Sequence, residues 1–263
     1  MTDATSTAGD ARPAIGLIRS SLLRADVTVL LRSGRTLLLN IAVPILYLVI
    51  TNLHLGTKGR GFTYGSTGFT IGLALTVGLM SSSLMGYATA IAHDRDAGVF
   101  QRLRVTPAPT SAIMASRLIV QIVVDLIMTV VVVIVGGIIH HATFGAGEYL
   151  LLVCVSIVGG AMFLAIAQAV VGLVRSAAVV DAIGRMFYIV FLLLGLLGSS
   201  GLLGSTVREV SDWSPVGAVT NLYSGVLDLA HWSWADSYGL IATVGYTVIG
   251  AVVGIRWFRW DPR

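Results

Sequence analysis

Polar side chains that could hold a proton, an ion or a ligand interrupt the apolar runs of the sequence at two places. The first is a line of residues spaced four apart, Arg117, Gln121, Asp125 and Thr129, and the second is the pair Asp181 and Arg185. Residues four apart lie on the same side of a helix, so Asp181 and Arg185 are able to form an ion pair. Two interpretations stay open: these residues border a hydrated inner cavity, or they form a structural network between helices.

Sequence motifs that would indicate covalent catalysis, metal binding or ATP hydrolysis are incomplete or missing in this sequence. Residues 198–201 read GSSG, which is similar to the G-x-S-G nucleophile motif of rhomboid-type intramembrane proteases. A serine nucleophile needs a base within hydrogen-bond reach, and the last apolar run, where that family carries its histidine, has none. The five histidines show no H-E-x-x-H spacing, and the single lysine, Lys58, lies outside any G-x-x-x-x-G-K-[ST] motif. We therefore expect no catalysis, no bound metal and no ATP hydrolysis on this chain.

The composition places these residues in a membrane. Hydrophobic residues make up 56% of the 263 residues and charged residues 11%, and the mean hydropathy is +0.87. Globular domains have about 25% charged residues. Six apolar runs reach or approach the length of about 20 residues that a helical span requires. They predict an all-α integral membrane protein with spans at residues 36–53, 67–92, 111–139, 149–174, 177–201 and 238–258.

The distribution of basic residues predicts the orientation of these spans. Fourteen arginines fall on one side of the membrane, and only Lys58, Arg60 and Arg208 fall on the other. Because the side rich in Lys and Arg is cytoplasmic, both termini are predicted to lie in the cytoplasm. The basic residues flank apolar runs and do not form one patch, which argues against nucleic-acid binding.

The first 35 residues are predicted to form a region separate from the transmembrane domain at residues 36–263. Residues 1–12 are small and polar and lack the features of a signal peptide, which indicates a cytoplasmic tail. Residues 13–35 combine an apolar face with arginines, which predicts an amphipathic helix at the cytoplasmic interface. A plain helical extension of the first span is the alternative.

A charged stretch, DRDAGVFQRLRVTP at residues 94–107, lies between two of the longest apolar runs. Asp94 can act as an N-cap, the arginines near the other end suit a helix C-terminus, and Pro107 stops the helix. The stretch predicts a cytoplasmic helix of about three turns. Its apolar edge, formed by Val99, Phe100 and Leu103, is one that a second protein could hold. A solvated loop is the alternative.

The segment at residues 202–236, between the last two predicted spans, contains a helix start. Ser214 is suited to be an N-cap and Pro215 to be the first helical residue. Trp232 and Trp234 are typical of a headgroup boundary. The segment therefore predicts an external re-entrant or interfacial helix, with a simple surface loop as the alternative.

The six-span plan and the stretch at residues 94–107, followed by Ser116 and Arg117, resemble the membrane subunit of the type-2 ABC exporter family, including bacterial drug-efflux permeases of the daunorubicin-resistance kind. The resemblance covers nearly the whole chain. Positions that match the family's pattern are Asp94, Arg95, Asp96, Gly98, Phe100, Leu103 and Pro107. Aspartates stand where glutamates are usual, and Val99 and Gln101 replace a common threonine and acid. Residues 213–215 (WSP) also resemble the family's segment before the last span.

The resemblance implies a permease dimer, of identical or related chains, in a bacterial inner membrane. Two separately encoded subunits would bind ATP and Mg, and this chain would need no cofactor. Hydrophobic drugs or lipid-like molecules would leave the cell by alternating access. The stretch at residues 94–107 would be a coupling helix seated in the ATPase, with contacts from Asp94, Arg95, Asp96, Gly98, Phe100, Arg102, Leu103 and Arg104. The second and fifth spans would border the pathway, near Asp181, Arg185, Phe187, Tyr188 and Phe191. Gln121 and Asp125 of the third span are further candidates for the pathway or a cavity, on the grounds of their polar side chains alone.

Two other classes of function remain as alternatives. A transporter driven by an ion gradient would use Asp125 as a protonatable group and would need no ATPase, although the sequence shows no clear inverted repeat of broken helices. An intramembrane protease would depend on Ser199 or Ser200.

Overall fold

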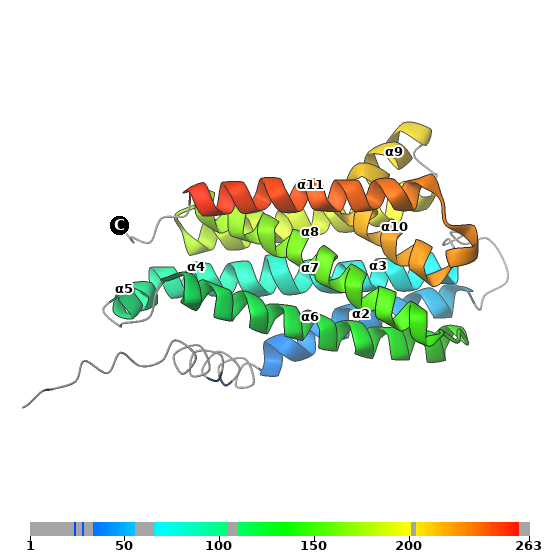
Figure 1. Cartoon of the computed structure of the whole chain (residues 1–263), viewed down its shortest axis with the longest axis horizontal. Coiled ribbons are helices and arrows are strands. Elements are labelled where there is room, and N and C mark those ends of the chain that lie inside the picture. Colours follow the sequence, from blue (N-terminus) through cyan, green and yellow to red (C-terminus); the bar gives the residue numbers. More distant parts are fainter. Residues whose placement is uncertain are drawn as a thin grey trace, which may run out of the picture.

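A computed structural model describes residues 24, 28, 34–55, 66–104, 110–200 and 204–257 of the chain. These residues are almost entirely helical, and none of them forms a β-strand. The long helices run beside one another along the longest axis of the molecule, with α5 (Val99–Arg104) at one end and α9 (Ser205–Trp213) at the other (Figure 1). The prediction of an all-α protein is confirmed for the part of the chain that the structure describes.

Five helical stretches are long and apolar enough to cross a membrane. The first, Thr67–Asp96, combines α3 (Thr67–Met80), the π-helix η1 (Ser81–Tyr87) and α4 (Ala88–Asp96). The others lie in α6 (Thr110–His140), α7 (Ala146–Leu173), α8 (Ala177–Ser200) and α11 (Trp234–Trp257). The chain is therefore a multi-pass membrane protein. The first predicted span falls on α2 (Gly34–Leu55), whose apolar part, Asn40–Leu53, is shorter, so the count of six spans stays a prediction.

The stretch from α3 to α4 occupies the centre of the bundle. Every residue from Thr70 to Met80 is buried, because α2, α6, α7 and α10 (Pro215–Leu227) pack around α3. A helix that is apolar on all sides is one that other helices must surround. The π-helix η1 continues this central helix and was not predicted from the sequence. Such segments are rare and occur often at functional sites.

The predicted helix start before the last span is confirmed. The Ser214 side chain accepts a hydrogen bond from the Gly217 backbone N–H at 3.1 Å, and Pro215 is the first residue of α10. The apolar face of α10 is buried against its neighbours, and the α9 helix, which the sequence did not predict, precedes it. Whether this segment enters the membrane stays a prediction.

Several predicted features lie outside the described residues. They are most of the amphipathic helix expected at residues 13–35, the residues around Pro107, residues 201–203 and the last six residues of the chain.

Helices α7 and α11 pack closely through small residues, which gives a test of the fold. A Cβ atom at Gly250 would lie 2.8 Å from the Ala165 backbone carbon, whereas a Cβ at Gly245 would meet nothing within 4 Å. Gly250→Ala is therefore expected to destabilise the protein by about 1–3 kcal/mol through overpacking. Gly245→Ala is the matched control, which should be neutral or stabilise α11 by up to about 1 kcal/mol. Thermal unfolding of the full chain in detergent measures both, and equal effects would contradict this packing.

Candidate functional site

The candidate site lies at the end of the bundle where α4 turns into α5. Helix α4 ends at Asp96, and Gly98 follows with φ of 70°, in the left-handed region that glycine adopts without strain. The Gly98 N–H donates to the Arg95 carbonyl oxygen at 3.0 Å, which closes the turn. A glycine just beyond the last helical residue is a common helix ending. The turn redirects the chain, and α5 begins at Val99.

The predicted single helix starting at Asp94 is therefore wrong in its first part. Asp94 and Asp96 lie in the last turn of α4 and cannot cap the helix that follows. The described part of the separate helix α5 is Val99–Arg104. The physical reason is the left-handed conformation of Gly98, which interrupts the helix between the acidic and basic halves of the stretch.

Asp94 connects α4 to α6. Its Oδ2 accepts a hydrogen bond from Arg117 Nη1 at 2.5 Å, and both side chains are partly shielded from solvent. The Arg117 guanidinium also lies over the Phe100 ring, 5.2 Å from its centre, in a cation–π contact. Arg117 therefore holds α4 and α5 against α6.

Phe100 is buried, with 1% of its surface exposed. We predicted that this ring belongs to an apolar edge available to a second protein. That prediction is wrong for Phe100, because the chain's own helices enclose the ring. Its role in the structure is to anchor α5 to the bundle.

Arg95 and Asp96 connect α4 to α7 and α8. Arg95 is buried and its Nη1 donates to the Val171 carbonyl oxygen in the last turn of α7 at 2.8 Å. Asp96 Oδ2 accepts a hydrogen bond from the backbone N–H of Ala177, the first residue of α8, at 3.0 Å. A carboxylate at this place satisfies a free N–H and favours the positive end of the helix dipole. Arg95 is thus enclosed by the bundle, whereas the Asp96 side chain stays 44% exposed while its Oδ2 holds Ala177.

His93, the residue before Asp94, adds a further contact between α4 and α8. His93 Nε2 lies 3.3 Å from Asp181 Oδ2 on α8. The sequence indicated that Asp181 could pair with Arg185, and no such pair forms among the described residues. His93 was missed at the sequence level, because its partner is 88 residues away along the chain.

The exposed residues of this corner are His93 and Asp96 in α4, Ala97 in the turn, and Gln101 and Arg102 in α5. Gln101 and Arg102 project from α5 into solvent. Leu103 and Arg104 complete α5, and their side chains lie outside the described part of the structure. Among the described side chains of α5, Gln101 and Arg102 are thus the ones that another protein can reach.

We call the contacts made by His93, Asp94, Arg95 and Asp96 the α4 clamp.

The predicted polar line on α6 runs from Arg117, at the α5 end, through the partly buried Gln121 to Asp125 and Thr129, which are buried inside the bundle. Gln121 donates to Ser82 Oγ in the π-helix and to Asp125 Oδ1 at 3.2 Å. Asp125 is 1% exposed, and its Oδ2 has no hydrogen-bond partner among the described residues. A Cβ atom at Gly160 of α7 would lie 3.2 Å from that oxygen, so the carboxyl group packs against α7. Ser82 was not predicted to take part.

The remaining predicted residues lie on α8. Phe187, Tyr188 and Phe191 are partly buried against the core, and the rings of Phe187 and Phe191 lie 5.7 Å apart. Arg185 is exposed on the outward side of the helix. These residues do not contact Asp125 in the structure, so the two polar groups singled out in the sequence are separate. Ser199 and Ser200 are the last residues of α8, and their side chains are not described.

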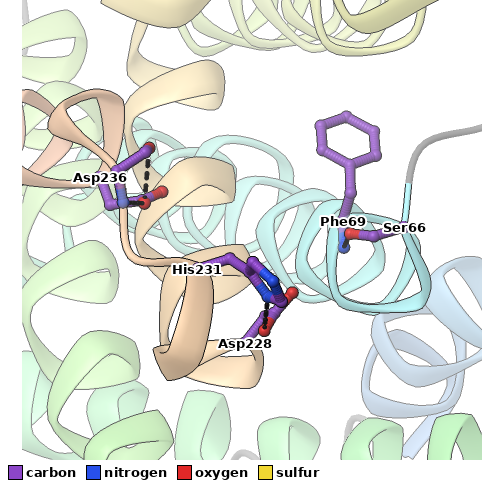
Figure 2. A network of polar contacts seen from close by, with 6 residues as sticks. Ser66, Phe69, Asp228, His231 and Asp236 are labelled. Carbon is purple, nitrogen blue, oxygen red and sulfur yellow. Dashed lines mark hydrogen bonds and ion pairs between the residues drawn. The ribbon is translucent and has the colours of Figure 1, made fainter.

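A cavity of about 330 Å³ opens at the opposite end of the bundle, between the start of α3 and the connection from α10 to α11. Its lining includes Arg208, Asp212, Asp228, His231 and Asp236. Figure 2 shows the His231 ring directed at Asp228, with Nδ1 and Oδ1 2.8 Å apart. This hydrogen bond, together with the charge of Asp228, raises the pKa of His231 above its ordinary value. The cavity is polar, and the described residues contain no group of three or more potential metal ligands.

The contacts at the α5 end of the bundle can transmit a displacement of α5 to the helices α6, α7 and α8. A force applied to Gln101 or Arg102 reaches α6 through Arg117, and the α4 clamp passes it to α7 and α8. The contact between α5 and Arg117 is the cation–π contact with Phe100, and the contacts from α4 are hydrogen bonds or ion pairs, which are stronger when a charged group takes part.

Comparison with known protein families identifies the family of the chain. A family model described as ABC-2 type transporter matches residues 20–227, which extend from the N-terminal region to the end of α10 and include the whole α4–α5 corner. No curated protein matches the chain significantly.

Proposed function

The chain belongs to the ABC-2 type transporter family and is the membrane-spanning permease of an ABC transporter, and we propose that it exports hydrophobic drugs or lipid-like molecules using ATP hydrolysed on separate subunits. In this proposal two ATP-binding subunits carry ATP and Mg, and two permease subunits form the transmembrane part. The membrane is the bacterial inner membrane, and both termini of the chain lie in the cytoplasm. The α5 end of the bundle then faces the ATPase.

The observation that supports this proposal most directly is the construction of the α4–α5 corner. The corner exposes Gln101 and Arg102 on a short helix whose other described contacts go to the chain itself. A surface that only formed a loop would not need buried arginine and aromatic anchors to hold it in place. A surface that receives force from a partner does need them, because a loose attachment would absorb the movement.

Each residue of the α4 clamp then has a part in the mechanism. Closure of the ATPase pair displaces α5 and α4 as one unit. Asp94 draws α6 along through Arg117, Arg95 holds the C-terminal end of α7, and Asp96 holds the N-terminal end of α8. The helices move as rigid bodies between two states, which the nucleotide and the transported molecule populate differently.

The π-helix provides a place where the central helix can change shape. It lies between α3 and α4, and its Ser82 is hydrogen-bonded to Gln121 of α6. A π-helical segment can shift to α-helical pairing when one residue changes register. We propose that displacement of α4 changes this segment, and that the contact from Ser82 to Gln121 transmits the change to the middle of α6.

Vesicles that contain the purified chain, with or without its ATPase, test the proposal. ATP-driven movement of a hydrophobic dye is expected only when both components are present, and the permease should stimulate ATP hydrolysis. Movement of the dye without the ATPase would contradict the proposal.

A transporter driven by an ion gradient is the second candidate function, and one observation favours it. Asp125 is enclosed and one of its oxygens has no partner among the described residues, as expected of a group that exchanges a proton. Asp125→Asn separates the two functions. Under the ABC proposal the variant retains ATP-driven transport, with at most a change in substrate preference. Under the second function it abolishes gradient-driven transport, and wild-type vesicles transport without ATPase. Thr129→Val serves as the control that alters a neighbouring polar residue without removing a titratable group.

A further inference from the structure

The outward side of α8 carries a charge where the corresponding sides of other spanning helices are apolar. The exposed side chains described on α6 are all apolar, and those on α11 include no charge before Arg256 in its last turn. On α8 the exposed residues form one stripe at helical spacing, consisting of Ala178, Val179, Ala182, Arg185, Met186, Ile189, Val190 and Leu193. Arg185 is the single charged residue in this α8 stripe.

Arg185 has no hydrogen-bond or ion-pair partner among the described residues. Asp181, one helical turn away, directs its Oδ2 at His93 on α4. The described exposed surfaces of α6, α8 and α11 contain no other aspartate or glutamate that could neutralise the guanidinium. Among the described residues, Arg185 therefore has no bonded counter-charge, and Asp181, whose Oδ1 also has no hydrogen-bond partner there, is the nearest acid along the helix.

The position of Arg185 makes this charge costly in a lipid bilayer. It lies eight residues beyond Ala177, whose N–H is bonded to Asp96 at the α5 end of the bundle. At 1.5 Å per residue, this distance is about 12 Å, within a hydrocarbon core about 30 Å thick. The flexible stem of arginine shortens the distance to the interface only in part. An arginine at such a depth normally meets an anion or a hydrated pathway.

A second copy of the chain would not supply the missing anion through this face. A twofold contact between α8 stripes would bring a second Arg185 and no carboxylate, because the stripe contains no acid. A ligand remains as a source of the anion. A guanidinium binds a phosphate group through two parallel hydrogen bonds, which makes phosphate its most suitable partner.

We propose that Arg185 binds the phosphate group of an anionic amphiphile that enters from the membrane leaflet on the α5 side. Its apolar chains lie along Met186, Ile189 and Leu193, which are 52%, 56% and 48% exposed. This inference rests on the proposed export function and narrows its substrate class to phosphate-bearing, lipid-like molecules.

A binding experiment without nucleotide or ATPase tests this assignment separately from transport. The full chain is placed in nanodiscs of phosphatidylcholine and titrated with spin-labelled phosphatidic acid or spin-labelled phosphatidylcholine. The wild-type protein is expected to prefer phosphatidic acid by about tenfold, the range of a charge-assisted hydrogen-bond pair. Arg185→Gln should abolish the preference, and Arg185→Lys should retain part of it. Arg175→Gln, which removes an exposed arginine at the α7–α8 turn, is the matched control and should retain it.

Equal binding of phosphatidic acid by the wild type and Arg185→Gln would overturn the proposal. An equal loss in Arg175→Gln and Arg185→Gln would also overturn it, because surface charge alone would then explain the preference.

If Arg185→Gln does not fold, Ile189→Glu gives the same test with Arg185 in place. The new carboxylate, one turn away, should occupy the guanidinium and lower the preference. Unchanged preference in that variant would overturn the proposal. A failure of ATP-driven transport, by contrast, would leave this binding result unaffected.

Discussion

Arg102→Glu is expected to reduce ATP-driven transport and the stimulation of ATP hydrolysis by about tenfold or more. The reason is that like charges that face each other across an interface cost several kcal/mol. Arg102 is exposed on α5, and no described contact ties it to the bundle. The variant should therefore insert and unfold like the wild type. Transport into inverted vesicles and ATPase activity of the assembled complex measure the effect.

The matched control for this variant is Arg256→Glu. Arg256 is also exposed, lies in the last turn of α11, and carries the same charge away from α5. It should retain most of the transport activity. Normal stimulation of the ATPase by Arg102→Glu would show that α5 does not meet the partner through this residue, and equal losses in both variants would indicate a general effect of surface charge.

Phe100→Ala is expected to destabilise the protein by about 3–5 kcal/mol, the usual cost of removing a buried aromatic ring. The ring is enclosed by the bundle and lies under the Arg117 guanidinium, so its loss leaves a cavity and removes the anchor of α5. Transport should fall together with stability. Thermal unfolding in detergent, and limited proteolysis at α5, measure the effect directly.

Phe100→Leu separates the packing role of the ring from its contact with Arg117. It retains most of the buried volume and removes the cation–π contact, worth about 0.5–1 kcal/mol at such sites. It should therefore cost much less than Phe100→Ala. A Phe100→Ala protein that is as stable as the wild type and fails only to bind the ATPase would contradict the buried position of this ring and restore a role in direct contact.

The spanning helices were predictable because a bilayer leaves the backbone few alternatives. In hydrocarbon every backbone N–H and C=O must be paired within the segment, so an apolar run of sufficient length predicts a helix. The start of α10 was also predictable, because Ser214 and Pro215 act locally. The π-helix was not predictable, since its register depends on the helices packed around it.

The location of the site stays a prediction, and its predicted local geometry was wrong. Gly98 was itself the signal for the corner, because a glycine after a charged helix end indicates a helix stop. The partners of Arg95 and Asp96 lie 76 and 81 residues away along the chain, and no pattern in a single sequence reveals contacts at such separations. For the same reason the sequence suggested that Asp94, Arg95 and Asp96 face a partner, whereas the structure directs all three at the chain's own helices.

If α5 receives the movement of a separate ATPase, a photo-reactive group on α5 should capture that ATPase. Gln101, exposed beside Arg102, is replaced by cysteine in a Cys154→Ser background, because Cys154 is the chain's only cysteine and is exposed. The thiol is then modified with a photo-reactive group in native membranes. A matched cysteine at Arg208, in the opposite end of the bundle, is the control. Position 101, and not position 208, is expected to cross-link to a separate protein with a P-loop, with a yield that changes when ATP is added. Cross-links from position 101 only to lipid or to another copy of this chain, in membranes that still transport, would contradict it.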